Sequence, residues 1–85
     1  MNKFQFILLS VLESNGATTP LKAMSSYDIQ NEIEGLNYTI NYICRTLNIF
    51  QEEGLVKRGL NDRRSITFFI TKEGLNKIKD LRGEC

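Results

Sequence analysis

Histidine is absent from this sequence of 85 residues, and cysteine occurs only as Cys44 and Cys85. Without histidine, a zinc site or an acid–base mechanism near neutral pH loses its usual side chain. Cys44 falls inside a helical pattern and Cys85 at the last position, with no metal-ligand spacing between them, so neither a disulfide framework nor a metal site is expected. No cluster of candidate acids, bases or nucleophiles converges in the sequence. We therefore expect no cofactor and no enzymatic activity.

Long hydrophobic runs are missing as well. The most apolar stretch, residues 4–12, is interrupted by Gln5 and Ser10 and closed by Glu13. A membrane-spanning helix needs roughly 20 apolar residues, and a signal peptide needs a small-residue cleavage site after its apolar segment. We expect a cytoplasmic protein that makes no membrane contact.

The length of the chain allows one core, because a chain this short buries only about 60% of its unfolded surface. The hydrophobic fraction of 41% and the charged fraction of 25% are close to the averages of soluble globular domains, so disorder is not expected. We expect a single domain over residues 1–85.

The net charge is only +1, but its distribution along the chain is uneven. Residues 1–55 contain three basic and six acidic residues, whereas residues 56–85 contain eight basic and four acidic ones. Four of those eight basic residues stand within one eight-residue stretch that contains a single acid. They are Lys57, Arg58, Arg63 and Arg64. This stretch is a local basic patch.

The first half of the chain predicts three helices. Apolar residues recur at helical spacing from Lys3 to about Asn15, where a glycine follows as a stop. A loop comes next, which has room for a very short strand near Ala23 and Met24. Ser25 precedes Asp28 by three residues, as in the capping box that opens a helix.

A tight turn at residues 36–38 then leads to the longest predicted helix, residues 40–53. Thr39 can cap this helix, and Gly54 supplies its stop. Its apolar side chains recur at i, i+4 and i+7 and are expected to face inward. They are Ile43, Leu47 and Phe50.

The second half predicts a β-hairpin and a last helix. Residues 55–60 and 65–70 have the pattern of two strands, joined by a polar tip. Alternation predicts Ile66, Phe68 and Ile70 on one face of the second strand and Ser65, Thr67 and Phe69 on the other. Thr71 can cap the last helix, which Gly83 ends. Its inward residues are expected to be Leu75, Ile78 and Leu81.

This order of elements predicts an α+β fold, a winged helix-turn-helix with a three-helix core, a two-stranded β-hairpin wing and a C-terminal helix. Four segments carry a family resemblance. They are Ser25-Ser26-Tyr27-Asp28-Ile29, Leu47 to Val56 with Phe50 and Gly54, Asp62-Arg63-Arg64, and Ile70-Thr71 with Gly74. In this order and spacing the chain resembles the MarR-like and PadR-like winged helix-turn-helix regulators of bacteria. The resemblance implies a DNA-binding repressor of transcription that acts as a homodimer.

The helix over residues 40–53 is the candidate recognition helix, because a helix fits the major groove and its outward side chains reach base edges. The outward candidates near its start are Thr39, Asn41, Tyr42 and Arg45. Asparagine can pair with adenine, arginine with guanine, and a hydroxyl group with phosphates or bases. Arg45 is the leading candidate, since it is the only basic residue on a helix whose end carries two acids.

The wing over residues 55–70 offers the basic candidates Lys57, Arg58, Arg63 and Arg64. The last two stand at the tip, where a wing approaches the minor groove, and the first two could hold the adjacent backbone. Charges at a hairpin tip are otherwise simply solvated. Following a recognition-like helix, they favour DNA binding.

The first helix is apolar around more of its circumference than one small core requires. Phe4, Phe6, Ile7 and Leu9 are therefore candidates for a dimer interface, although a place in the core is the simplest interpretation. Tyr42 could equally pack beside the second helix. Cys44 is expected to be a small buried hydrophobe without a role.

We therefore expect a sequence-specific regulator of transcription that binds double-stranded DNA. The alternative is a winged-helix module that binds proteins and not DNA, because the fold alone does not fix the function. Salt-dependent affinity for DNA separates the two hypotheses.

Overall fold

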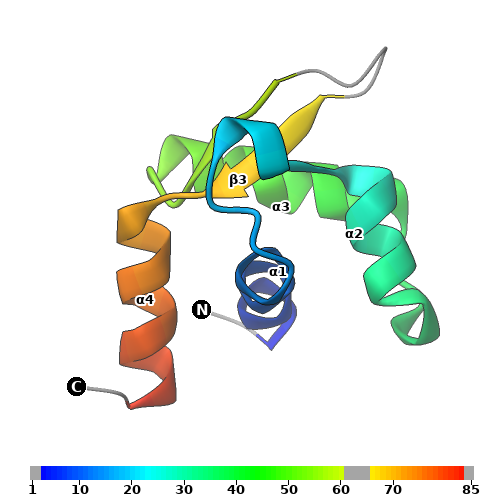
Figure 1. Cartoon of the computed structure of the whole chain (residues 1–85). Coiled ribbons are helices and arrows are strands. Elements are labelled where there is room, and N and C mark those ends of the chain that lie inside the picture. The colour runs from blue at the N-terminus through cyan, green and yellow to red at the C-terminus, as the bar shows by residue number, and fades with distance from the viewer. Residues whose placement is uncertain (1–2, 61–65, 84–85) are drawn as a thin grey trace.

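The computed structural model in Figure 1 describes residues 3–60 and 66–83. The helices are α1 (Lys3–Ser14), α2 (Ser26–Glu32), α3 (Ile40–Glu52) and α4 (Lys72–Arg82), with short 3-10 turns η1 (Pro20–Lys22) and η2 (Glu34–Leu36). The strands are β1 (Met24–Ser25), β2 (Val56–Arg58) and β3 (Thr67–Ile70). This order of elements confirms the predicted α+β winged helix-turn-helix. None of the helices in the two described ranges has the length and apolar character of a membrane span.

Side-chain caps open α2, α3 and α4 at the positions that the sequence predicted. The hydroxyl of Ser25 accepts a hydrogen bond from the N–H of Asp28, and the Asp28 carboxylate accepts one from the N–H of Ser25, both at 3.1 Å. Thr39 and Thr71 each accept from the N–H three residues further on. These bonds satisfy amides that the first turn of a helix leaves unpaired, so the polar signals in the sequence fix where the helices begin.

Two glycines make possible the close packing where α3, the sheet and α4 meet. Gly54 ends α3 with φ at 79°, a left-handed conformation that glycine adopts without strain. Gly74 lies in the first turn of α4, where a Cβ atom would collide with the carbonyl oxygen of Leu55. The missing side chain therefore lets α4 pack directly on the chain that leaves α3.

The sheet has three antiparallel strands in the order β1-β3-β2, the predicted hairpin together with the very short strand expected near Ala23. β1 pairs Ser25 with Thr67, so β3 becomes the central strand. Ile66 and Phe68 line the same surface hollow, as the predicted alternation requires, but burial does not follow the faces, because Thr67 is buried and Ile66 is 44% exposed. The η1 segment packs against β3, and the hydroxyl of Thr67 donates to the carbonyl of Leu60 at 2.5 Å, which satisfies the buried polar group.

α1 occupies the centre of the molecule. Figure 1 shows it end-on, with α4 to one side, α2 to the other and β3 above, and α1 packs against all three. Leu8, Leu9 and Leu12 of α1 are fully buried in one core with residues of every other helix. Burial of one such side chain stabilises the fold by about 1.5–3 kcal/mol. The apolar circumference of α1 is thus explained largely by its central position.

Because α1 is central, two of the residues predicted for the dimer interface lie in the core. Phe4 is 3% exposed and Leu9 is fully buried, so both belong to the core and are closed to a second chain. Leu81 differs in the opposite sense, because it was expected inside and is 43% exposed. The predicted inward residues Leu75, Ile78 and Leu81 are three residues apart. Each step of three residues turns a helix by about 300° and not a full 360°, so Leu81 lies away from the core.

Candidate nucleic-acid interface

α3 has a buried face and an exposed polar face. The three residues predicted to face inward, Ile43, Leu47 and Phe50, have no exposed surface. Each residue turns the helix by about 100°, which places Asn41, Arg45 and Asn48 together on the opposite side. All three are exposed, and within the described part of the chain Arg45 forms no ion pair. We call Asn41, Arg45 and Asn48 the polar stripe of α3.

Tyr42 does not belong to the polar stripe. Its ring stacks on Phe4 of α1, with centroids 4.5 Å apart and an angle of 22° between the rings, and Tyr38 packs against the same phenylalanine. Tyr42 is still 38% exposed, at the edge of the polar face. Thr39 lies at the start of α3 and is exposed, with its oxygen engaged as the helix cap.

The two described basic residues of the wing lie on opposite sides of β2. Lys57 and Arg58 are consecutive and exposed, and consecutive side chains of a strand point to opposite faces. Arg58 shares two surface hollows with Asn48 of α3, whereas Lys57 lines neither. The structure therefore brings Arg58 next to the polar stripe. Arg63 and Arg64 lie outside the described residues.

A groove of about 320 Å³ separates α3 from the sheet. Its floor is formed by the apolar side chains of Ile40, Cys44 and Phe68, with Ile66 beside them. Its polar lining comes from Ser26, Tyr27, Asn48 and Arg58. Among the described residues that line it, Arg58 is the only charged one. We call this hollow the α3–wing groove.

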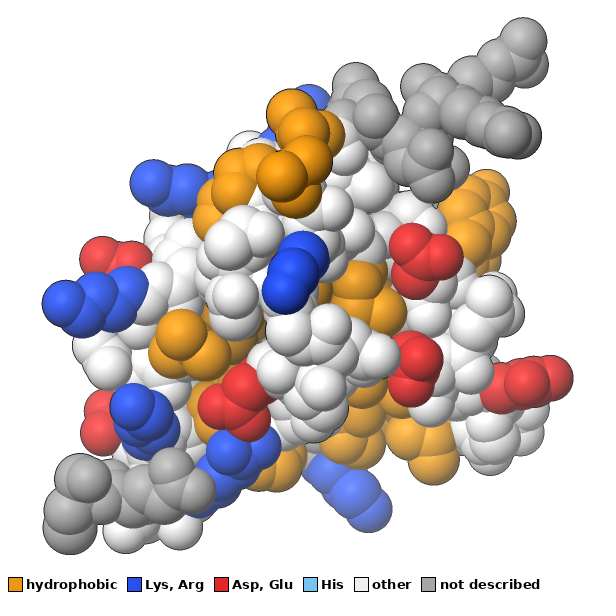
Figure 2. All heavy atoms as spheres, in the orientation of Figure 1, with side chains coloured by type: hydrophobic (Ala, Val, Ile, Leu, Met, Phe, Trp, Pro, Cys, Tyr) orange, Lys and Arg blue, Asp and Glu red, His pale blue; other side chains and the backbone are white. Residues whose placement is uncertain are grey.

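The opposite side of the molecule suits a polyanion less well. Figure 2 shows acidic side chains over the part of the surface where α2 lies, and a mixture of basic and acidic ones over α4. The exposed acids of α2 and η2 are Asp28, Glu32 and Glu34. α3 lies behind the sheet in this view, so its polar stripe is on another face.

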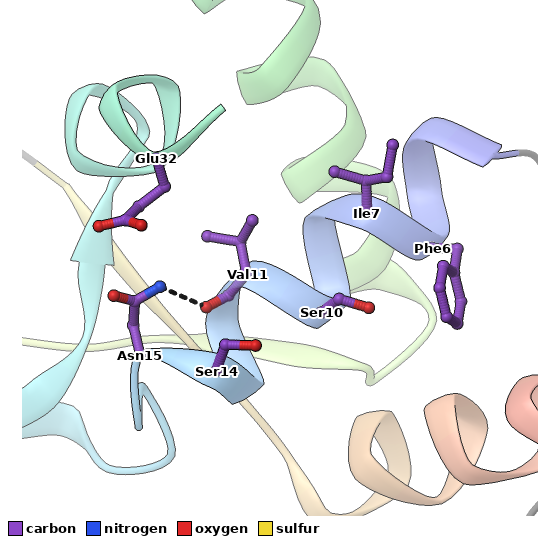
Figure 3. A pocket seen from close by; sticks show the side chains of 7 residues that line it. All are labelled: Phe6, Ile7, Ser10, Val11, Ser14, Asn15 and Glu32. Atoms are coloured by element: carbon purple, nitrogen blue, oxygen red, sulfur yellow. Dashed lines mark hydrogen bonds between the residues drawn. The ribbon is translucent and has the colours of Figure 1, made fainter. Parts of the chain in front are cut away.

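A second groove, of about 300 Å³, runs along α1 (Figure 3). Phe6, Ile7 and Val11 supply its apolar lining, and Glu32 of α2 borders it. The buried hydroxyl of Ser10, which also lines this groove, has no hydrogen-bond partner within the described ranges. Of the four predicted interface residues, only Phe6 and Ile7 thus remain partly exposed.

One curated relative matches almost the whole chain. The DNA-binding protein TubR of Clostridium botulinum C phage is 32% identical over 81 residues, which are 95% of this chain and 96% of the relative. This chain belongs to the TubR family. A scan against protein-family models gave no match.

Solved structures place the TubR-family chain within the same fold. TubR from Bacillus megaterium pBM400 superposes with a TM-score of 0.79 at 18% identity, over 95% of this chain and 86% of that one. The wild-type MarR of E. coli superposes with a TM-score of 0.74 at 17% identity, over 94% of this chain and 54% of that one. The resemblance to MarR-like regulators is thereby confirmed as a similarity of fold.

Sequence reasoning found two members of the polar stripe and missed the third. Asn48 follows Asn41 and Arg45 at i+7 and i+3, so the helical period used for the inward face could have found it. Cys44 was given no role, and it lines the α3–wing groove. That groove joins four separate segments of this TubR-family chain, so its composition could not be read from local spacing.

Proposed function

We propose that this chain is a transcriptional regulator that binds double-stranded DNA in a sequence-specific manner, with α3 in the major groove and the wing near the minor groove. The observation that carries the proposal is the polar stripe of α3, exposed along a helix whose opposite face is wholly in the core. Asn41 and Arg45 have the donors and acceptors that read adenine and guanine. Membership of the TubR family supports the proposal, because the phage relative is named a DNA-binding protein.

The remaining candidate residues are assigned to the sugar–phosphate backbone. Thr39 and Tyr42 stand at the start and at the edge of the polar face, where hydroxyl groups meet phosphates. Arg58, beside α3, and Lys57, on the other face of β2, supply positive charge from the wing. Arg63 and Arg64 stay a prediction of the same kind from the sequence. These contacts give affinity and not base preference.

The regulator acts as a homodimer and as a repressor in the cytoplasm. The groove along α1 supports the dimer, because a second copy could cover Phe6, Ile7 and Val11 there (Figure 3). Two copies would present two α3 helices, which suits a palindromic operator with half-sites about one helical turn of DNA apart. A repressor of this kind occupies the operator and blocks the polymerase.

The test is binding of the full chain to mixed genomic DNA fragments at several salt concentrations. We expect the wild type to select particular fragments and Arg45→Ala to lose that selection by roughly tenfold, because one bidentate contact to a base is worth about 1–3 kcal/mol. Lys77→Ala, an exposed charge on α4, is the control and keeps the selection. If the wild type has no affinity for DNA even at low salt, the proposal is wrong and the chain is a protein-binding module.

A further inference from the structure

We infer that residues 15–23, which we call the η1 loop, hold the wing in the direction in which it meets DNA, and that Pro20, Gly59 and Thr67 are the positioning residues. The inference rests on the proposed function and deepens it, because it states what aims the wing at the duplex. These three residues act without touching DNA. They act through Leu60, the last residue that the structure describes before the tip of the wing.

The backbone of Leu60 is held by groups outside the strand ladder. Its neighbour Gly59 donates to the carbonyl of Thr67 at 2.9 Å, which prolongs the pairing of β2 with β3. The N–H of Leu60 donates to the carbonyl of Pro20 at 3.2 Å, and its carbonyl accepts from the hydroxyl of Thr67 at 2.5 Å. η1 and one buried side chain of β3 therefore fix the chain where it enters the tip.

The missing side chain of Gly59 lets η1 lie this close to the wing. A Cβ atom on Gly59 would stand 2.9 Å from the carbonyl oxygen of Pro20 and 2.9 Å from the hydroxyl of Thr67, and closer still to the Cβ atom of Ala23. The carbonyl and the Cβ atom of Ala23 are fixed to the backbone and cannot rotate away. The φ of Gly59 is not positive, so alanine can adopt this backbone and only the space is lacking.

The η1 loop is itself anchored in the core. Ala17 is fully buried, and its N–H donates to the carbonyl of Leu12 in α1 at 2.9 Å. The carbonyl of Ala17 accepts from the N–H of Ile70, the last residue of β3, at 2.8 Å. Figure 1 shows η1 lying across β3, against which it packs. The loop thus holds the hairpin at two points, Ile70 at its base and Leu60 near its tip, and relates the wing to the core.

A wing that is held in place binds DNA at a lower cost. Ordering a flexible segment on association costs free energy, and a segment that is already fixed avoids that cost. Arg63 and Arg64, the candidates for minor-groove contact, follow Leu60 by three and four positions in the sequence. The direction of the chain at Leu60 therefore governs whether they meet the duplex at the same time as α3.

Gly59→Ala is the first test, on the duplex that the wild type selects from genomic fragments. Fluorescence anisotropy at several salt concentrations gives the slope of log affinity against log salt concentration. We expect this slope to fall by up to about 1.8, because about 0.9 belongs to each of two phosphate contacts. Gly35→Ala, at a glycine with open space around it, is the matched control and should keep the wild-type slope. Circular dichroism before each titration checks that both variants are folded.

Two further comparisons separate positioning from a general loss of structure. In the Arg63→Ala/Arg64→Ala chain, Gly59→Ala should change the affinity by less than about twofold, because the contacts that it displaces are already gone. Thr67→Val lacks the hydroxyl that holds Leu60 and should also lower the slope, whereas Thr67→Ser retains it and should keep the wild-type slope. If Gly59→Ala does not fold, the two substitutions of Thr67 decide.

The outcomes distinguish this inference from the proposed function. A folded Gly59→Ala with the wild-type slope overturns the inference, and so do equal slopes for Thr67→Val and Thr67→Ser. A loss of affinity in Gly59→Ala that is as large without the two arginines as with them also overturns it. Each of these results leaves the proposed function intact. A wild type that selects no duplex overturns the proposed function itself.

Discussion

Thr71 shows how much one side chain contributes to this small fold. Its hydroxyl accepts from the N–H of Gly74 at 3.1 Å and donates to the carbonyl of Gly54 at 2.7 Å, and its own N–H donates to Leu55 at 3.0 Å. Thr71 thus caps α4 and also ties it to the chain that leaves α3. The sequence predicted the cap from local spacing, but the bond to Gly54 joins residues 17 positions apart and needed the tertiary structure.

This double role predicts a larger loss of stability than an ordinary cap gives. Thr71→Val should lower the free energy of unfolding by about 2 kcal/mol, about 1 for the cap and about 1 for the buried hydrogen bond. Thr39→Val, which removes an exposed cap only, is the matched control and should cost about 1 kcal/mol. Urea unfolding of both variants measures the difference. Equal losses would mean that the bond to Gly54 contributes nothing.

At the scale of elements, the periodicity of each segment gave its type, and its neighbours decided which faces are covered. The caps and stops placed α2, α3 and α4 to within a few residues. The alternation of β3 predicted which side chains share a face, whereas the burial of Thr67 depends on η1, which packs against β3. The sequence also predicted the very short strand near Ala23, but its pairing with β3 joins distant segments, so only the folded chain reveals that β3 is central.

The alternation of β2 makes a testable distinction between two consecutive basic residues. Arg58→Gln should reduce the slope of log affinity against log salt concentration by about 0.9, because one phosphate contact beside α3 is lost. Lys57→Gln changes the same charge on the other face of β2 and should reduce the slope less. Fluorescence anisotropy on one duplex, titrated at several salt concentrations, gives both slopes. Identical slopes for the two variants would contradict the placement of Arg58 next to bound DNA.

At the scale of the whole molecule, the question is which apolar surface the single chain already uses. The sequence showed more apolar residues on the first helix than one small core requires. It predicted a dimer interface formed by Phe4, Phe6, Ile7 and Leu9. Burial in the single chain removes Phe4 and Leu9 from that set, because α1 is enclosed by α2, α4 and β3. An ion pair of 2.7 Å between Glu13 and Arg82 further joins α1 to α4. The surface left for a second copy is the groove along α1.

A charged group introduced at the edge of this groove should oppose the proposed dimer. Ser14 is exposed in the last turn of α1, where a positive charge does not oppose the helix, and it lines the groove. Ser14→Arg should therefore fold normally and raise the dimer dissociation constant at least about tenfold, because a long charged side chain would lose its water on association. Sedimentation equilibrium measures the constant. Asn31→Arg, an exposed site on α2, should leave it unchanged, and a dimer unaffected by Ser14→Arg would place the interface elsewhere.

The sequence by itself determined the order of the elements, their caps and stops, and the inward face of α3. These features depend on residues within one or two turns of each other, which is the range over which helical period and capping act. Tertiary structure alone decided that β3 is central, that Phe4 and Leu9 are core, and that Cys44, Asn48 and Arg58 share a groove. Each of these results depends on segments far apart in the chain, whose contacts follow from packing and not from local spacing.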